Sequence, residues 1–166
     1  MRRIVERSGL AWDAPAPFEP TLSGEDGKTL AQALLAPTRI YVKTVLPHLK
    51  AGRIEGLAHI TGGGLIENVP RVLPDRAVAE IDAKSWPLPP VFAWLKKSAS
   101  IEAQELARTF NCGIGMVVAV EASRADAVKA VLEAHGETVY RIGHVRSRLG
   151  SEAQSQVLGA EEAWRG

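Results

Sequence analysis

The sequence has very little cysteine, no long apolar run and no excess of charge of one sign. Cys112 is the single cysteine in 166 residues, which excludes a disulfide within the chain and a cage of thiolate ligands. The four histidines do not fall at zinc-binding spacing, so we expect no metal site made within this chain. Cysteine this sparse is typical of a reducing compartment, and we therefore expect a cytoplasmic location.

Missing apolar runs exclude further classes of protein. No stretch approaches the length that spans a membrane, and the basic N-terminus lacks the apolar core of a signal peptide. The 20 basic and 19 acidic residues are interleaved, so no basic stripe favours nucleic acid and no basic cluster favours a membrane surface. Small molecules or other proteins are the expected partners.

The length and composition of the sequence predict one globular domain with less regular segments at both ends. We expect a helix and a Pro/Gly-rich linker over residues 1–27, a domain over 28–146 and a flexible tail over 147–166. The helix near the N-terminus is uncapped and too short to be stable alone, so its packing partner is expected outside this chain.

The hydrophobic periodicity predicts an α+β fold, a mixed sheet layered with helices. Strand 113–120 is apolar on both faces and is expected to be a central, covered strand. The expected helices cover 29–36, 41–50, 65–72, 90–97, 101–110 and 125–135, and the expected strands 57–60, 76–81, 113–120 and 138–145.

One stretch, Gly56-Leu-Ala-His-Ile-Thr-Gly-Gly-Gly-Leu-Ile-Glu-Asn68, carries most of the chemistry. Gly62, Gly63 and Gly64 admit positive φ and leave backbone N–H groups open to an oxyanion, and a helix is expected to begin after them. His59 and Thr61 are two apart on a short strand and would face one ligand together. The alternative is that the glycines only make a tight turn and that His59 is a core histidine.

A second glycine-rich stretch is Phe110-Asn-Cys-Gly-Ile-Gly-Met116. Its glycines stand at the entry to a strand, where glycine marks the close approach of other atoms, and the first glycine loop is one expected neighbour. Neither stretch has the Lys-Ser/Thr of a Walker A loop or the spacing of a dinucleotide fingerprint. Cys112 is expected to be a packing residue.

Arg39, in the short connection Pro37-Thr-Arg39, is either a phosphate ligand or a surface ion pair.

Several motifs in the same order resemble one family, phosphoribosylformylglycinamidine cyclo-ligase, also called aminoimidazole ribonucleotide (AIR) synthetase. The motifs are Arg3-Ile-Val-Glu, Leu35-Ala-Pro-Thr-Arg-Ile-Tyr41, Gly56 to Gly64, Glu67-Asn-Val-Pro-Arg-Val-Leu73, Arg108-Thr-Phe-Asn-Cys-Gly-Ile-Gly-Met116 and Ile142-Gly143. All of them belong to the C-terminal half of that family. The resemblance implies the fold of an AIR synthase C-terminal domain, partly ferredoxin-like in topology, with residues 1–27 as a residual inter-domain helix and linker.

The resemblance also implies a reaction and a set of site residues. The reaction is the ATP-dependent closure of formylglycinamidine ribonucleotide to aminoimidazole ribonucleotide, with release of ADP and phosphate. His59 and Thr61 would be catalytic, and Gly62, Gly63, Gly64, Asn68, Asn111 and Arg39 would bind substrate or phosphate. We expect ATP, Mg²⁺ and a homodimer in the complete enzyme, and none of these cofactors on this chain alone.

The chain would then be inactive without its N-terminal half, which bears the metal-nucleotide loops of the family. The alternative is a stand-alone, non-catalytic module of the same superfamily that binds an anion or a nucleotide. Other members of that superfamily, such as an amidotransferase, a hydrogenase-maturation protein or a thiamine-phosphate kinase, fit the combined motifs less well.

Overall fold

Short helices and strands alternate along the chain in the computed structural model, which describes residues 1–19 and 27–165. The elements are α1 (Arg2–Ser8), α2 (Leu30–Leu34), α3 (Val42–Lys50), β1 (Gly56–His59), α4 (Gly64–Asn68), η1 (Val69–Val72), β2 (Ala77–Asp82), η2 (Ala83–Ser85), α5 (Pro90–Ala99), α6 (Ala103–Thr109), β3 (Met116–Ala119), η3 (Ala122–Arg124), α7 (Ala125–Ala134), β4 (Gly143–Ser147), β5 (Ser155–Leu158) and α8 (Ala160–Ala163), where η is a 3-10 helix. The predicted α+β class is confirmed. Within the described ranges, no helix is long and apolar enough to cross a lipid bilayer.

The described strands form two small sheets, whereas the sequence suggests one central sheet. β1 pairs with β3 in antiparallel register, with His59 opposite Met116. In the other sheet β2 is central, antiparallel to β4 and parallel to β5. The mixed sheet that was predicted is therefore present, but its members are not those expected.

The expected central strand over 113–120 is shorter and less covered than its composition suggests. β3 begins only at Met116, and its residues are half-buried in a two-stranded sheet. The preceding residues form a turn, in which the N–H of Ile114 donates to the carbonyl oxygen of Asn111. The strand expected over 138–145 is likewise displaced, because β4 covers Gly143–Ser147.

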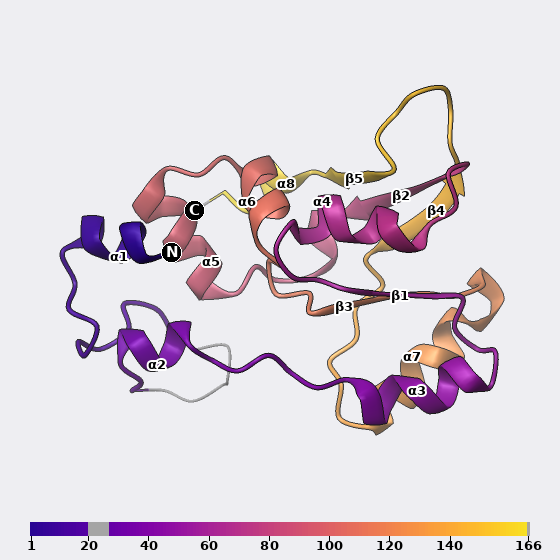
Figure 1. Ribbon diagram of the computed structural model, residues 1–166, viewed down its shortest axis with the longest axis horizontal. Helices are drawn as coiled ribbons and strands as arrows, with labels where there is room; N and C mark the ends of the chain where they lie inside the picture. Colours follow the sequence, from indigo (N-terminus) through magenta and orange to yellow (C-terminus); the bar gives the residue numbers. More distant parts are fainter. Residues whose placement is uncertain (20–26, 166) are drawn as a thin grey trace.

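The β1–β3 sheet lies between two layers, with α4 and the three-stranded sheet on one side and α3 and α7 on the other (Figure 1). Alternation along β1 explains how the two sides are filled. Ala58 and Ile60 belong to the main core, whereas Leu57 packs on a smaller cluster formed by Val45 of α3 and the α7 residues Val128 and Leu132. His59 shares the α3 side of the sheet with Leu57, because the two are two residues apart.

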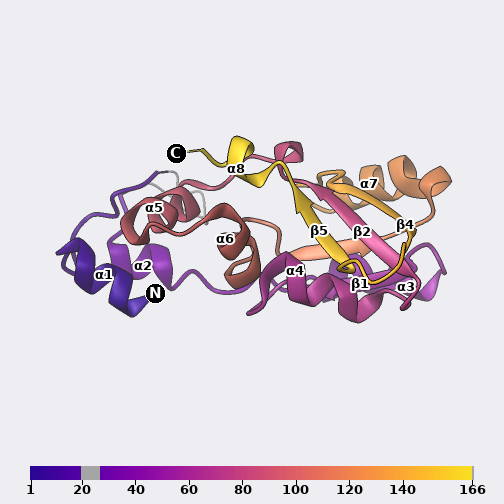
Figure 2. The ribbon, with the colours of Figure 1, turned by 90° about the horizontal axis from the view of Figure 1, so that it is seen from above.

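α1, α2 and α5 lie together at one end of the molecule, and α3 and α7 lie at the other end (Figure 2). α1 has its packing partner within this chain, contrary to the sequence-based expectation, since it lies against α5 and buries Val5 almost completely. Phe18, in the expected linker, packs on Trp94 of α5 with ring centroids 5.4 Å apart. The rest of that linker, at 20–26, lies outside the described residues.

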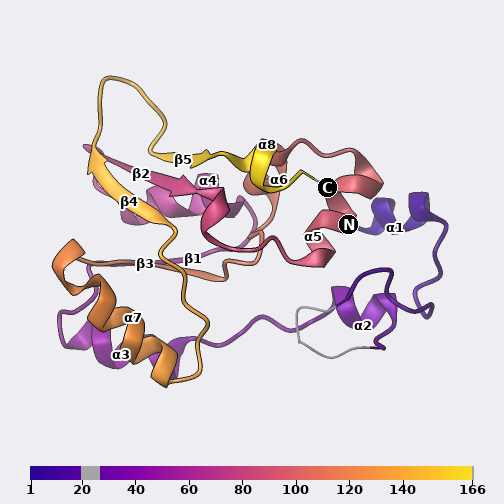
Figure 3. The same ribbon diagram turned by 180° about the vertical axis from the view of Figure 1, so that it is seen from behind.

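The segment expected to be a flexible tail is packed into the fold instead. β5 adds a strand to β2, and α8 lies beside α6 (Figure 3). The hydroxyl of Ser155 donates to the carbonyl oxygen of Leu65 over 3.0 Å. Trp164 is buried against Trp86 with ring centroids 5.7 Å apart. Its abundant polar residues made the segment resemble a tail, but Val157, Ala160 and Trp164 are core residues.

Candidate functional site

The turn between β1 and α4 needs glycine at two positions. The N–H of Gly64 donates to the carbonyl oxygen of Thr61 over 3.0 Å, which closes the turn. Gly63 and Gly64 have φ of 98° and 55°, a region that side chains rarely adopt. A Cβ at Gly64 would also overlap the carbonyl oxygens of Ala107 and Phe110 at the end of α6. The turn is thus pressed against the segment that opens the second glycine-rich stretch, as expected.

Asn68 fixes this turn from inside. Its side chain is buried, and its amide donates to the carbonyl oxygens of Gly64 over 2.8 Å and Gly62 over 3.1 Å. The hydroxyl of Thr61 lies 3.5 Å from the amide oxygen of the same side chain. Asn68 therefore shapes the turn from below, and its amide is not directed at a ligand.

His59 and Thr61 lie on the exposed side of the chain, on either side of buried Ile60. The exposure of His59 excludes the alternative of a core histidine. Among the described residues, the N–H groups of Gly62 and Gly63 donate to no recorded acceptor, so they are available to an oxyanion. An imidazole, a hydroxyl and two backbone amides without a recorded acceptor therefore lie within five successive residues at the end of β1.

The helix dipole contributes less to this turn than the sequence suggests. α4 has only five residues before it tightens into η1, and dipole effects require an extended helix. The carboxylate of Glu67 also lies close to Gly63. Any attraction for an anion therefore comes mainly from the two amides of Gly62 and Gly63.

Beside this turn an apolar groove opens between α3 and the β1–β3 sheet, with a volume of about 480 Å³. We call it the α3 groove. It is lined by Thr38, Arg39, Ile40, Tyr41, Val42, Val45, Leu46, Leu49, Leu57, His59 and Met116. Its size and its apolar walls with a few polar groups are typical of small-molecule sites. His59 thus belongs both to the glycine turn and to the α3 groove.

Arg39 also lines the α3 groove, at its rim. Its guanidinium donates to the carbonyl oxygen of Gly136 and pairs with the carboxylate of Glu137, both over 2.9 Å. Its side chain is 57% exposed, so part of the guanidinium still faces solvent. The ion pair fixes the start of α3 on the turn after α7, and the role of phosphate ligand stays a prediction.

Asn111 and Cys112 lie in the second glycine-rich stretch and turn away from the groove. The side chain of Asn111 accepts a hydrogen bond from the N–H of Gly113 over 3.1 Å, which stabilises the local turn. Cys112 is fully buried, and burial raises the pKa of its thiol to about 12. A thiol with so high a pKa is not a nucleophile at neutral pH, in agreement with a packing role.

Tyr41 is a groove residue that was not predicted to belong to the site, because the helical pattern of 41–50 accounted for it. Its ring crosses from the start of α3 to β3, where a Cβ at Gly115 would overlap its hydroxyl. Burial, reinforced by the charge of Glu137 and opposed by Arg39, raises the pKa of the phenol, so it is protonated at neutral pH. The signal in the sequence was Gly115, a glycine at a strand entry.

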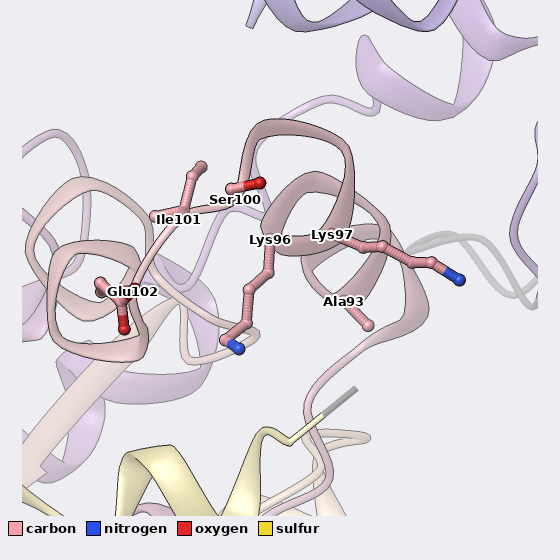
Figure 4. Close-up of a pocket in the computed structure, with 6 residues that line it drawn as sticks. All are labelled: Ala93, Lys96, Lys97, Ser100, Ile101 and Glu102. Atoms are coloured by element: carbon pink, nitrogen blue, oxygen red, sulfur yellow. The ribbon is translucent and has the colours of Figure 1, made fainter.

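A second hollow of about 220 Å³ lies where α5 meets α6. Lys96, Lys97 and Ser100 line it, but the two amino groups point in different directions (Figure 4). Within residues 1–19 and 27–165, no three His, Cys, Asp or Glu side chains cluster as a metal site. The glycine turn and the α3 groove are therefore the strongest candidate site.

Comparison with known proteins shows the family to which this chain belongs. A family model described as AIR synthase related protein, C-terminal domain, matches residues 2–155. The chain therefore belongs to the family of AIR synthase related proteins and corresponds to their C-terminal domain, as the motifs indicate.

Two relatives are named as particular enzymes. The phosphoribosylformylglycinamidine cyclo-ligase of Neisseria meningitidis serogroup C is 55% identical over 157 residues, which cover 95% of this chain and 43% of the relative. The protein of the same name from Neisseria gonorrhoeae is 54% identical over the same share of each chain. The chain thus spans less than half the length of these curated relatives.

Proposed function

We propose that this chain is the C-terminal half of a cyclo-ligase that closes formylglycinamidine ribonucleotide to aminoimidazole ribonucleotide and converts ATP to ADP and phosphate. The main support is its 55% identity, over 95% of its length, to a relative named as a cyclo-ligase. The exposed group at the end of β1 agrees with such chemistry, because phosphoryl transfer requires positioned donors more than a covalent nucleophile.

In this proposal the formyl oxygen of the substrate receives the γ-phosphoryl group of ATP, which releases ADP. The amidine nitrogen then attacks the activated carbon, the carbon–oxygen bond breaks, and the oxygen leaves as inorganic phosphate while the nitrogen loses a proton. The N–H groups of Gly62 and Gly63 hold oxygens that carry the developing negative charge. His59 moves a proton at the reacting nitrogen or oxygen, and the hydroxyl of Thr61 orients the substrate. Arg39 contributes its exposed edge to a phosphate group.

The nucleotide and its Mg²⁺ are assigned to the other half of the enzyme. Mg²⁺ prefers carboxylate and phosphate oxygens, and the described residues hold no cluster of acidic side chains to supply them. The proposed complete protein is a homodimer in the cytoplasm in which this chain forms one wall of the active cleft. Without the N-terminal half this chain is expected to be inactive.

Reconstitution tests the proposal. The chain is joined to the N-terminal region of the Neisseria meningitidis relative, and ATP-dependent formation of aminoimidazole ribonucleotide is measured. We expect turnover by the joined protein and none by either part alone. A joined protein that is folded and dimeric but does not turn over would contradict the proposal, and tight calorimetric binding of the substrate nucleotide by this chain alone would favour the stand-alone binding module.

A further inference from the structure

The imidazole of His59 lacks the hydrogen bond that usually orients a functional histidine. Within residues 1–19 and 27–165, its nitrogens make no recorded hydrogen bond or ion pair. Its recorded side-chain contact is with the ring of Tyr41, at a centroid separation of 6.3 Å and an interplanar angle of 69°. This is an edge-to-face arrangement within the usual range for aromatic pairs. Among the recorded ring contacts of the described residues, this is the one that can restrict the orientation of the imidazole.

The ring of Tyr41 is itself held firmly at its far end. Its hydroxyl lies against the backbone of Gly115, in space that a Cβ would fill. The carbonyl oxygen of Gly115 accepts a hydrogen bond from the N–H of Ile60 over 3.0 Å, directly beside His59. The backbone on which the Tyr41 hydroxyl packs is therefore hydrogen-bonded to the residue that follows His59.

The backbone of Tyr41 is held as firmly as its ring. Its carbonyl oxygen accepts from the N–H groups of Thr44 and Val45, each over 3.0 Å, in the first turn of α3. The hydroxyl of Thr44 donates to the carboxylate of Glu137 over 2.9 Å, and Glu137 also pairs with Arg39. These bonds fasten the start of α3 to the turn after α7. The backbone of Tyr41 is thus held by hydrogen bonds, and its ring is confined by packing against Gly115.

We propose that Tyr41 is a positioning residue for His59, and that Gly115 is a glycine because any side chain there would displace the tyrosine ring. The ring limits the rotamers of an imidazole that makes no recorded hydrogen bond within the described residues, and holds it at the mouth of the α3 groove. The effect on catalysis rests on the function proposed above; the effect on the imidazole does not. The motif Pro37-Thr-Arg-Ile-Tyr41 and the second glycine-rich stretch thereby act on the same histidine.

NMR on the complete 166-residue chain tests this role directly. Three-bond couplings across the Cα–Cβ bond of His59 report whether the imidazole keeps one rotamer, independently of the magnetic effect of a neighbouring ring. We expect Tyr41→Leu to move these couplings toward the rotamer-averaged values of a free histidine, Tyr41→Phe to leave them nearly unchanged, and Gly115→Ala to act like Tyr41→Leu. Tyr140→Leu is the matched control, because Tyr140 is an exposed tyrosine whose ring makes no recorded aromatic contact in the described chain.

Backbone amide spectra establish that each variant is folded, and the two substitutions at Tyr41 suffice if Gly115→Ala does not fold. His59 couplings that stay the same in Tyr41→Leu would overturn the proposal. In the joined protein, we expect Tyr41→Leu to lower kcat at least about tenfold, with KM changed less than about twofold, and Tyr41→Phe to restore kcat. A joined protein without any activity contradicts the proposed function, while the NMR result still decides the role of Tyr41.

Discussion

The side-chain amide of Asn68 donates a 2.8 Å hydrogen bond to the backbone carbonyl oxygen of Gly64, and both residues are buried. The same amide also reaches Gly62, so one side chain at the end of α4 fixes the shape of the turn that precedes the helix. The geometry of the amides of Gly62 and Gly63 therefore depends on a side chain that is buried beneath the turn.

Replacing Asn68 with Ala should lower the free energy of unfolding by about 1–3 kcal/mol, because buried carbonyl oxygens lose their donor. Urea denaturation of the 166-residue chain measures this change. Asn111→Ala is the matched control: it removes one hydrogen bond from a half-buried asparagine and should cost less. Equal losses in the two variants would contradict the role assigned to Asn68.

The glycines of the turn should differ sharply in their tolerance of a side chain. Gly64→Ala should cost about 2 kcal/mol or more, since it forces a strained φ and overlaps two carbonyl oxygens. Gly62→Ala should leave stability almost unchanged, because a Cβ there meets no atom within 4 Å. Thermal unfolding of the two variants side by side provides the measurement, and similar transition temperatures would argue against the described turn.

His59→Ala separates function from folding. In the joined protein we expect turnover to fall by about a hundredfold or more, as for the loss of a proton-transfer group. Stability should change little because the imidazole is exposed and makes no recorded hydrogen bond within the described ranges. Unchanged turnover would remove His59 from the catalytic residues, and a large loss of stability would indicate a structural role.

The C-terminal residues should be essential to the core. Trp164→Ala should destabilise the chain by about 3–5 kcal/mol, because it empties a buried site against Trp86. Trp12→Ala is the control, since that tryptophan is largely exposed. Denaturant unfolding followed by circular dichroism distinguishes the two, and a Trp164 variant as stable as the control would support the flexible tail expected from sequence.

Acid should weaken the junction of β4 and β5. Hydrogen bonds from Arg146, and after it from the N–H of Leu149, lower the pKa of Glu152 from 4.5 to about 2. A carboxylate whose pKa is lower in the folded state stabilises the fold above its unfolded pKa, so this contribution is lost as the pH falls from about 4.5 toward 2.

Glu152→Gln should therefore flatten the dependence of stability on pH in that interval, as measured by thermal unfolding from pH 5 downward, in steps of about half a unit. Glu6→Gln, at an exposed glutamate that forms no ion pair in the described residues, should keep the full dependence. Identical pH profiles for the two variants would refute the assignment.

Local patterns in the sequence were sufficient for most helices. Thr29 was predicted to cap a helix, and it forms a reciprocal pair with Gln32 at the start of α2. The apolar stripe of 125–135 likewise corresponds to α7, which buries Val128 and Leu132. These signals lie within one or two helical turns, so the sequence carries them directly.

Pairings between distant segments were not accessible in the same way. β5 has only four residues, and it is a strand because β2 offers a free edge, which no pattern within 155–158 reveals. The apolar stretch 113–120 predicted a longer and more buried strand than β3. Residues 113–115 do not join the strand, and the space beside Gly113 and Gly115 is occupied by Pro89 and Tyr41. For the candidate site, the glycine turn could be foreseen, whereas the approach of Tyr41 to His59 joins two motifs that are separate in sequence.

The parallel pairing of Ala79 with Ser155 also has a consequence for biosynthesis. β2 leaves the ribosome long before β4 and β5 do, so both of its edges stay open while most of the domain is being made. Such an edge can pair with another nascent chain, and contacts between distant segments form slowly. Pairing of β5 with β2 therefore removes the last open edge of β2. Until residues 155–158 have been synthesised, β2 remains open to aggregation and to chaperone binding.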